Sequence, residues 1–322
     1  MKEKELINII KNILNSEYIG DDCAYLKDLN IVVSQDSLVE GVHFSLSYTT
    51  AYQLGRKTVM VNISDICASG AKPKYLTISL SIPDYIDEKF VEEFYKGAKD
   101  ACGDVKIVGG DITGSDKLYI SATAIGSTIG RKISSRSNAK IGYKIIVSGE
   151  HGNSAKGLEI LSGKLKVESE KLNNFQFSTF NFQQDISLLP DNIKLSTSKF
   201  LQSHLMPVAR TDFSRQISQN CTQDYAMTDT SDGLEDALMQ IAKASNVRLK
   251  IDTSKIPHDA YVDMDTVLFG GEDYELVAVV PKDLHIDGAT EIGEVVDGDT
   301  GLEIDEEFYT DIDDKLFNHF KR

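Results

Sequence analysis

Apolar and polar residues follow two different periods along this chain. Near the N-terminus, apolar residues recur at helical spacing among alternating Lys and Glu, at Leu6, Ile9, Ile10, Ile13 and Leu14. This pattern predicts an amphipathic helix over residues 1–17 and not a secretory signal. Residues 75–82 instead alternate Leu and Ile with Thr and Ser before Pro83, which predicts a half-buried strand. The β-branched run 31–33 predicts a short buried strand that ends at Ser34.

Between these segments the chain alternates helices and strands. Thr49 and Thr50 offer a cap for a helix that is apolar nearly all round in its second half and reaches Gly70, and Asp87 caps a second helix. Strands are expected over 106–108, followed by a Gly-Gly-Asp turn, and over 118–125. This order predicts a mixed α/β domain.

The polar segment 130–142 is the predicted domain boundary, so we divide the chain into an N-terminal domain, 1–138, and a C-terminal α/β domain, 139–322. The second half is expected to hold strands over 143–147, 225–228, 248–251 and 274–280. Helices are expected near Phe200, from Thr211 and over 234–245. Residues 162–198, rich in Asn, Gln, Ser and Lys, predict a surface excursion.

Four apolar segments run into aspartate beside Gly, Ser or Thr and supply five candidate aspartates, and a sixth lies inside the helix that reaches Gly70. Together they supply six carboxylates: Asp22, Asp36, Asp65, Asp111, Asp229 and Asp232. Hard oxygen ligands on loops at strand ends suit Mg²⁺, which keeps waters and bridges to phosphates. Glycines at 109, 110 and 233 let backbone N–H groups approach phosphate oxygens. The pattern therefore predicts one site for several metals and a polyphosphate.

Asp65 is expected to carry a desolvation cost, because the helix that contains it is expected to be buried. An unpartnered buried aspartate costs several kcal/mol. It therefore needs a cation, or else hydrogen-bond donors from a neighbouring loop, and the sequence leaves both open. A pair of carboxylates acting on a sugar is the rival chemistry, but the acids number more than two and Trp is absent.

The charge composition limits the classes of molecule that the protein is expected to bind. The net charge of −16, from 34 basic and 50 acidic residues, opposes binding to nucleic acid or anionic membranes. An acidic protein binds phosphates when divalent cations lie between them. No apolar run approaches 18 residues, so no membrane helix is predicted. The four separated cysteines predict reduced thiols in the cytoplasm, as inert core residues or, alternatively, with one as a nucleophile.

Two familiar phosphate or metal motifs are missing. Gly109 and Gly114 have P-loop spacing, but Ser115 and Asp116 follow where Lys-Ser/Thr is required. The segment 297–301 resembles a calcium loop only superficially and is expected to be a hairpin turn.

The motifs resemble those of the thiamine-monophosphate kinase family, within the ATP-binding superfamily of aminoimidazole ribonucleotide synthetase, selenophosphate synthetase and a hydrogenase maturation factor. The matching blocks occur in the family's order over nearly the whole chain. They are Ile19-Gly-Asp-Asp-Cys-Ala24, Ser34-Gln-Asp-Ser-Leu-Val-Glu-Gly-Val-His-Phe44, Val61-Asn-Ile-Ser-Asp65 with Ala68-Ser-Gly-Ala-Lys-Pro73, Gly109-Gly-Asp111, Gly130-Arg131 with Arg136, Gly152-Asn-Ser-Ala-Lys-Gly-Leu158, Asp229-Thr-Ser-Asp-Gly-Leu234 and Gly270-Gly-Glu-Asp-Tyr-Glu-Leu276.

The resemblance implies a role for each matching position. It implies Mg²⁺ ligands at Asp22, Ser34, Gln35, Asp36, Asp65, Asp111, Asp229 and Asp232. It implies ATP contacts at Asp22, Gly110, Asp111, Arg136 and Ser231, and contacts to the thiamine phosphate at His43, Glu272 and Phe317. The alternatives are a core histidine at 43, a surface ion pair at Arg136 and terminal packing at Phe317. Gln35 replaces the family's usual threonine, and Gly114 a frequent arginine.

As a whole, the resemblance implies a mixed α/β fold with mixed sheets, in the two-domain architecture of aminoimidazole ribonucleotide synthetase, assembled as a homodimer. The implied activity is transfer of the ATP γ-phosphoryl group to thiamine monophosphate with several Mg²⁺ ions and no side chain acting in proton transfer. Another ATP-dependent enzyme of the superfamily and a non-catalytic nucleotide-binding module stay open as alternatives.

Overall fold

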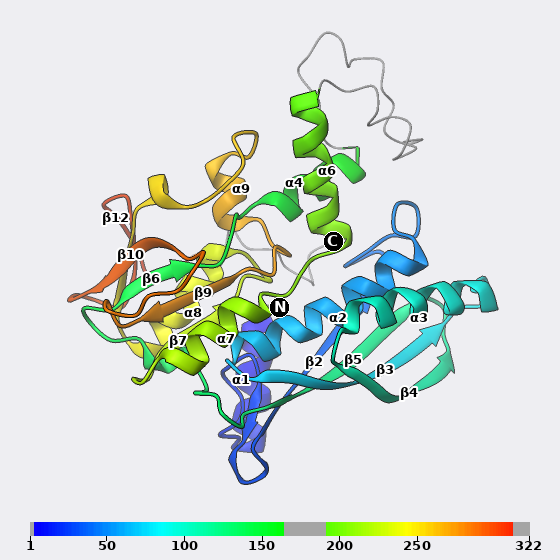
Figure 1. The fold of residues 1–322 in the computed structure, drawn as a ribbon, viewed down its shortest axis with the longest axis horizontal. Helices are drawn as coiled ribbons and strands as arrows, with labels where there is room; N and C mark the ends of the chain where they lie inside the picture. The colour runs from blue at the N-terminus through cyan, green and yellow to red at the C-terminus, as the bar shows by residue number, and fades with distance from the viewer. Residues whose placement is uncertain (1–2, 164–190, 312–322) are drawn as a thin grey trace.

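The fold is built on two mixed β-sheets (Figure 1). A computed structural model of the chain describes residues 3–163 and 191–311. The first sheet has the order β1-β2-β5-β3-β4. Its strands are β1 (Ala24–Leu26), β2 (Ile31–Val39), β3 (Lys72–Ile82), β4 (Lys106–Gly114) and β5 (Tyr119–Ser127). Only β3 and β4 pair in parallel, so this sheet is mixed, as the sequence predicts.

Two helices, α2 (Ala51–Ala68) and α3 (Glu88–Cys102), cover one face of the first sheet (Figure 1). The predicted caps are confirmed. Thr50 accepts from the backbone N–H of Gln53, whose side chain accepts from the Thr50 N–H, and Asp87 accepts from the Phe90 N–H. These caps satisfy backbone donors at the start of each helix and fix where it begins.

The second sheet has the order β12-β11-β8-β10-β6-β9-β7. Its strands are β6 (Lys144–Val147), β7 (Ala226–Asp229), β8 (Arg248–Ile251), β9 (Leu276–Val280), β10 (Thr290–Val296), β11 (Gly301–Ile304) and β12 (Glu307–Tyr309). The accompanying helices are α4 (Asn153–Leu161), α6 (Asp191–Leu205), α7 (Thr211–Asn220), α8 (Leu234–Ser245) and α9 (Met264–Phe269). Short 3-10 turns lie at Lys27–Leu29, Arg136–Asn138 and Thr253–Lys255.

Helix α2 packs between the two sheets. The hydrophobic core around Leu54 and Ile66 includes Ile78 of the first sheet, and it continues into Met227 and Ala278 of the second. The strands nevertheless divide cleanly between residues 24–127 and 144–309. The predicted domain division at 138/139 stays a prediction.

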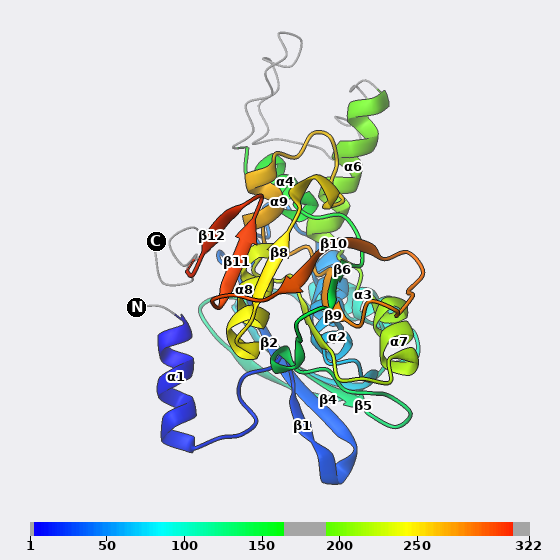
Figure 2. The same cartoon turned by 90° about the vertical axis from the view of Figure 1, so that its left-hand side faces the viewer.

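The N-terminal helix α1 (Glu3–Leu14) forms as predicted. Its apolar side chains stay largely exposed among the described residues, with Ile13 77% and Leu14 64% accessible. Figure 2 shows α1 standing apart from both sheets. No helix in the described ranges is long and apolar enough to cross a membrane.

Two strands are longer than the sequence predicts. Strand β2 does not stop at Ser34, because it pairs with β5 from Ile31 through Val39. Ser34 and Asp36 can lie inside it because polar groups of α2 meet them on the buried face. The Gly-Gly-Asp segment is not a turn but part of β4. Gly110 approaches β3 so closely that a Cβ there would lie 1.8 Å from the Ile78 carbonyl oxygen, which requires glycine.

The predicted hairpin turn at 297–301 is also wrong. The strands on either side, β10 and β11, do not pair with each other but flank β8. Because β8 pairs antiparallel with β10 and parallel with β11, the connection passes over one end of β8. Most of the predicted surface excursion, 162–198, lies outside the described residues, and its last part belongs to α6.

Candidate active site

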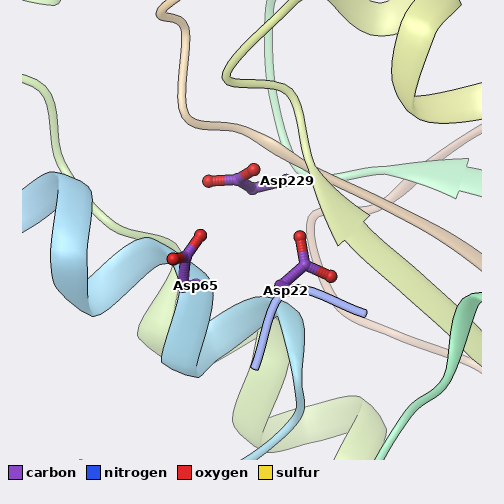
Figure 3. A group of neighbouring side chains, drawn as sticks. All are labelled: Asp22, Asp65 and Asp229. Atoms are coloured by element: carbon purple, nitrogen blue, oxygen red, sulfur yellow. The ribbon is translucent and has the colours of Figure 1, made fainter. Parts of the chain in front are cut away.

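Three carboxylates from distant parts of the chain converge between the sheets. Asp22 precedes β1, Asp65 lies in the last turn of α2, and Asp229 ends β7. One oxygen from each lies within 4.8 Å of the others (Figure 3). The sequence predicts this convergence, and the packing of α2 between the two sheets brings it about.

The cluster is electrostatically unfavourable by itself. Burial, with the charges of Asp36 and Asp229 added, raises the pKa of the Asp65 carboxyl well above its ordinary value. Burial and the charge of Asp22 raise the pKa of Asp229 to about 7. Like charges at this separation cannot all ionise unless positive charge is supplied. The group therefore needs cations in order to be fully ionised near neutral pH.

Protein groups meet only part of this need. The Arg136 guanidinium lies 2.8 Å from an Asp22 oxygen. Hydroxyl groups donate to each carboxylate: Thr228 Oγ1 to Asp22 at 2.7 Å, Ser64 Oγ to Asp229 at 2.6 Å, and Ser34 to Asp65. The remaining oxygens form a hard, anionic donor set, which is the kind that Mg²⁺ prefers. The residues present therefore fit the implied metal.

Ser64 and Thr228 were not singled out from the sequence. Each is adjacent in the chain to an aspartate of the cluster, Ser64 to Asp65 and Thr228 to Asp229, which is the one local signal that marks them. Asp21 was also missed. Its carboxylate accepts from the backbone N–H of Arg136 at 2.7 Å, and so ties the loop that carries this arginine to the Asp22 loop.

The other predicted metal residues are spread around this cluster. Asp36 lies on the buried face of β2, and its charge contributes to the raised pKa of Asp65. Its backbone N–H donates to the side-chain oxygen of Asn62. Gln35, the next residue back, faces the other side of the sheet and bonds Ser121 and Thr123. Asp232 is exposed in the loop before α8.

Gly110 and Asp111 are not brought to the cluster within this chain. They lie on the exposed edge strand β4, three strands from β2, which is about 14 Å. Across the strands, Asp111 pairs with Ser79, Ser79 with Ser121, and Ser121 with Ser37. Asp36 is the neighbour of Ser37 in β2, so its side chain lies on the opposite face of the sheet from that of Asp111. Since successive residues alternate faces, Asp111 points away from α2.

A second polar group lies farther along α2. The Lys57 ammonium contacts Glu272 Oε1 at 2.9 Å and the His43 carbonyl oxygen at 3.5 Å. His43 and Glu272, two predicted substrate residues, are therefore brought together. The Glu272 backbone N–H donates to the carbonyl of Ser231 at 2.6 Å, so its loop also touches the loop that follows Asp229. Phe317, the third predicted substrate residue, lies outside the described residues.

Comparison with known proteins identifies this arrangement. Residues 20–128 match the family described as AIR synthase related protein, N-terminal domain. The thiamine-monophosphate kinase of Aquifex aeolicus is 34% identical over 311 residues, 91% of each chain. That of Bacillus subtilis is 32% identical over 277 residues, 82% of this chain and 78% of the relative. The solved structure of AaThiL complexed with AMPPCP and TMP superposes with a TM-score of 0.81 at 31% identity, covering 99% of this chain and 97% of that one.

The two mixed sheets and the acidic centre between them place the protein among the AIR synthase-like proteins. Within that class, the chain belongs to the thiamine-monophosphate kinase family. The expected fold class is confirmed over the whole chain.

Proposed function

We propose that the protein transfers the γ-phosphoryl group of ATP to thiamine monophosphate, giving thiamine diphosphate and ADP. The observation that carries the proposal is the placement of two groups along α2 in a member of this family. The Asp22, Asp65 and Asp229 carboxylates lie at one end, and the His43 and Glu272 pair lies farther along. The AIR synthase-like relative that superposes on the full chain holds an ATP analogue together with TMP.

The difficulty of this reaction is electrostatic. The attacking oxygen belongs to a phosphate that is already largely ionised, so no side chain is needed as a general base. Two polyanions must instead meet within about 3 Å in an in-line geometry. Bound Mg²⁺ would neutralise the phosphates and stabilise the charge on the transferring group. Asp22, Asp36, Asp65 and Asp229 would hold these ions, and Arg136 and Ser231 would contact ATP.

The remaining predicted ligands suggest a dimeric enzyme. We propose that Asp232, Ser34 and the backbone carbonyl of Gln35 complete the metal and phosphate contacts of one chain, and that Gly110 and Asp111 act across a homodimer interface. The support is the location of Asp111 on an exposed edge strand, facing away from the carboxylates of its own chain. Unpaired edge strands are natural sites of pairing with a second copy. The four free, buried cysteines support a cytoplasmic location.

The test is product formation. Purified protein with ATP and Mg²⁺ is given thiamine monophosphate in one reaction and free thiamine in another, and thiamine diphosphate is measured by chromatography. Thiamine diphosphate from the monophosphate alone is the expected result. Binding of ATP without Mg²⁺-dependent turnover of thiamine monophosphate would contradict the proposal and support a nucleotide-binding module instead.

A further inference from the structure

Lys57 is a buried cation on the core-facing side of α2. Its side chain is 2% exposed, and Leu54 and Val61, one turn away on either side along α2, belong to the buried core. Burying an ammonium group costs several kcal/mol unless it is paired. Its partner is Glu272 Oε1 at 2.9 Å. The pair therefore holds together α2 and the loop 270–275, which are far apart in the sequence.

Glu272 is held in a conformation that its own backbone disfavours. Its φ of +67° lies in the left-handed region, which costs a residue with a side chain of order 1 kcal/mol or more. The side chain is still 23% exposed. Lys57 approaches Oε1, and Nδ1 of His204 lies 3.4 Å from Oε2. Both oxygens are thus held by neighbouring side chains, although the Glu272 side chain as a whole is not fully buried.

The charges around Glu272 balance within the fold. Burial acts to raise the pKa of this carboxyl, but the Lys57 ammonium and, after it, His204 hold it below the ordinary value. Burial and the neighbouring Lys57 lower the pKa of His204 to about 4, so this imidazole is neutral near pH 7. Its Nδ1 also lies 3.1 Å from Ser154 Oγ. An ionised Glu272 and a charged Lys57 therefore leave no net charge here, unlike at the carboxylate cluster.

The location of this group along α2 relates it to the reaction. Lys57 lies eight residues before Asp65, which places both on one helix face about 12 Å apart. This separation lets a phosphate ester of a nitrogen heterocycle reach Glu272 with its ring system while its phosphate lies at the carboxylate cluster. A carboxylate oxygen there accepts hydrogen bonds from ring amino groups.

We propose that Lys57, assisted by His204, is a positioning residue for the acceptor substrate: it holds the Glu272 carboxylate in place as the hydrogen-bond acceptor for the amino-heterocycle end. The inference rests on the proposed function, since it presumes a thiamine phosphate acceptor. Lys57 contacts Glu272 and the His43 carbonyl oxygen, and in this role it acts through them and makes no contact with the substrate.

The experiment compares Lys57→Met, Glu272→Gln and the double variant, with Lys99→Met on the exposed face of α3 as the matched control. Steady-state kinetics give kcat and the KM values for both substrates, and calorimetry measures binding of free thiamine, a probe without phosphate. We expect Lys57→Met to raise the KM for thiamine monophosphate about tenfold or more, with the KM for ATP nearly unchanged. The control should match the wild type.

The double variant separates positioning from direct contact. If Lys57 acts through Glu272, the double variant is no worse than the poorer single variant in KM and in thiamine binding. It should also unfold at a higher temperature than Lys57→Met, because no charge is left buried alone. This keeps the test intact if Lys57→Met folds poorly.

Three results would overturn the inference. The first is that the effects of the two single variants multiply in the double variant. The second is that Glu272→Gln binds thiamine as the wild type does, and the third is that Lys57→Met lowers kcat alone. A wild-type protein that binds thiamine and shows the Lys57–Glu272 coupling but makes no thiamine diphosphate would refute the proposed function and leave the positioning role standing. A wild type that binds no thiamine refutes the positioning role.

Discussion

The two polar groups along α2 solve the problem of buried charge in opposite ways. At the Asp65 end, carboxylates outnumber the cations that the described residues bring to them, and burial raises the pKa values of Asp65 and Asp229. At the Lys57 end, one carboxylate meets one ammonium, and the pKa of Glu272 is held low. One helix therefore carries a site that the fold neutralises and a site that it leaves anionic.

This difference separates two uses of buried charge. A charge that the fold balances itself is fixed in position and can orient a neutral or weakly charged group. A cluster left unbalanced has a strong affinity for cations, and through them for phosphates. The contrast predicts that removing a charge has opposite consequences for stability at the two ends.

Asp65→Asn gives the largest effect on activity. Removing one carboxylate from the anionic end should lower kcat about 10³-fold, since several kcal/mol of charge stabilisation are lost with the metal contact. The unfolding temperature without metal should stay the same or rise, because repulsion and desolvation are relieved. Calorimetric scans in chelator and product assays measure both. Asp104→Asn, at an exposed position, serves as the control. Near-normal turnover of Asp65→Asn would show that Asp65 is not a metal ligand.

The pH dependence of stability sharpens the contrast. Asp229 has a folded pKa of about 7, above its value in the unfolded chain, so its contribution is fully present at low pH and is lost as pH rises through 7. The metal-free protein should therefore lose stability between pH 5 and 8. Since one pKa unit corresponds to about 1.4 kcal/mol, the change amounts to a few kcal/mol.

Glu272 gives the opposite sign. Its lowered pKa contributes stability above its unfolded value, which is lost only as the pH falls below that value. Denaturant titrations from about pH 2.5 to 8, with chelator or with excess Mg²⁺, cover the titration of both groups and so measure both ends. Excess Mg²⁺ should flatten the slope above pH 5. If the stability of the protein in chelator were constant from pH 5 to 8, ionisation of the carboxylate cluster would not destabilise the fold.

The same contrast explains how much the sequence predicts. Asp22 and Asp229 each stand in a local pattern of apolar residues followed by Asp with Gly, Ser or Thr, and Asp65 lies in a helix that the sequence predicts to be buried, so their convergence can be predicted. The face on which a strand residue lies depends on pairing with distant strands, and therefore neither the extent of β2 nor the outward direction of Asp111 could be predicted. Lys57 carries no local signal at all. Its partner lies more than two hundred residues away in the sequence.

A smaller effect is expected at Thr228, whose hydroxyl donates to Asp22 and accepts from Arg136 Nε at 3.2 Å. Thr228→Val keeps the shape and removes this bridge. The Mg²⁺ concentration at half-maximal activity should rise about 10–100-fold, as for other groups that orient metal ligands. The KM for thiamine monophosphate should not change, because Glu272 is untouched. Thr300→Val, in the β10–β11 connection, serves as control, and an unchanged Mg²⁺ requirement would show that the bridge does not orient Asp22.

The smallest effect tests whether α2 acts as one rigid element. Thr50→Ala removes the side chain that caps α2 seven residues before Lys57, and it should lower the free energy of unfolding by about 1 kcal/mol. We expect kcat and both KM values to be unchanged, because Leu54, Val59 and Ile66 hold the body of the helix in the core. Urea unfolding and steady-state kinetics measure the two quantities. A raised KM for the acceptor alone would mean that the first turn of α2 sets the position of Lys57, and the two ends would then depend on different parts of the helix.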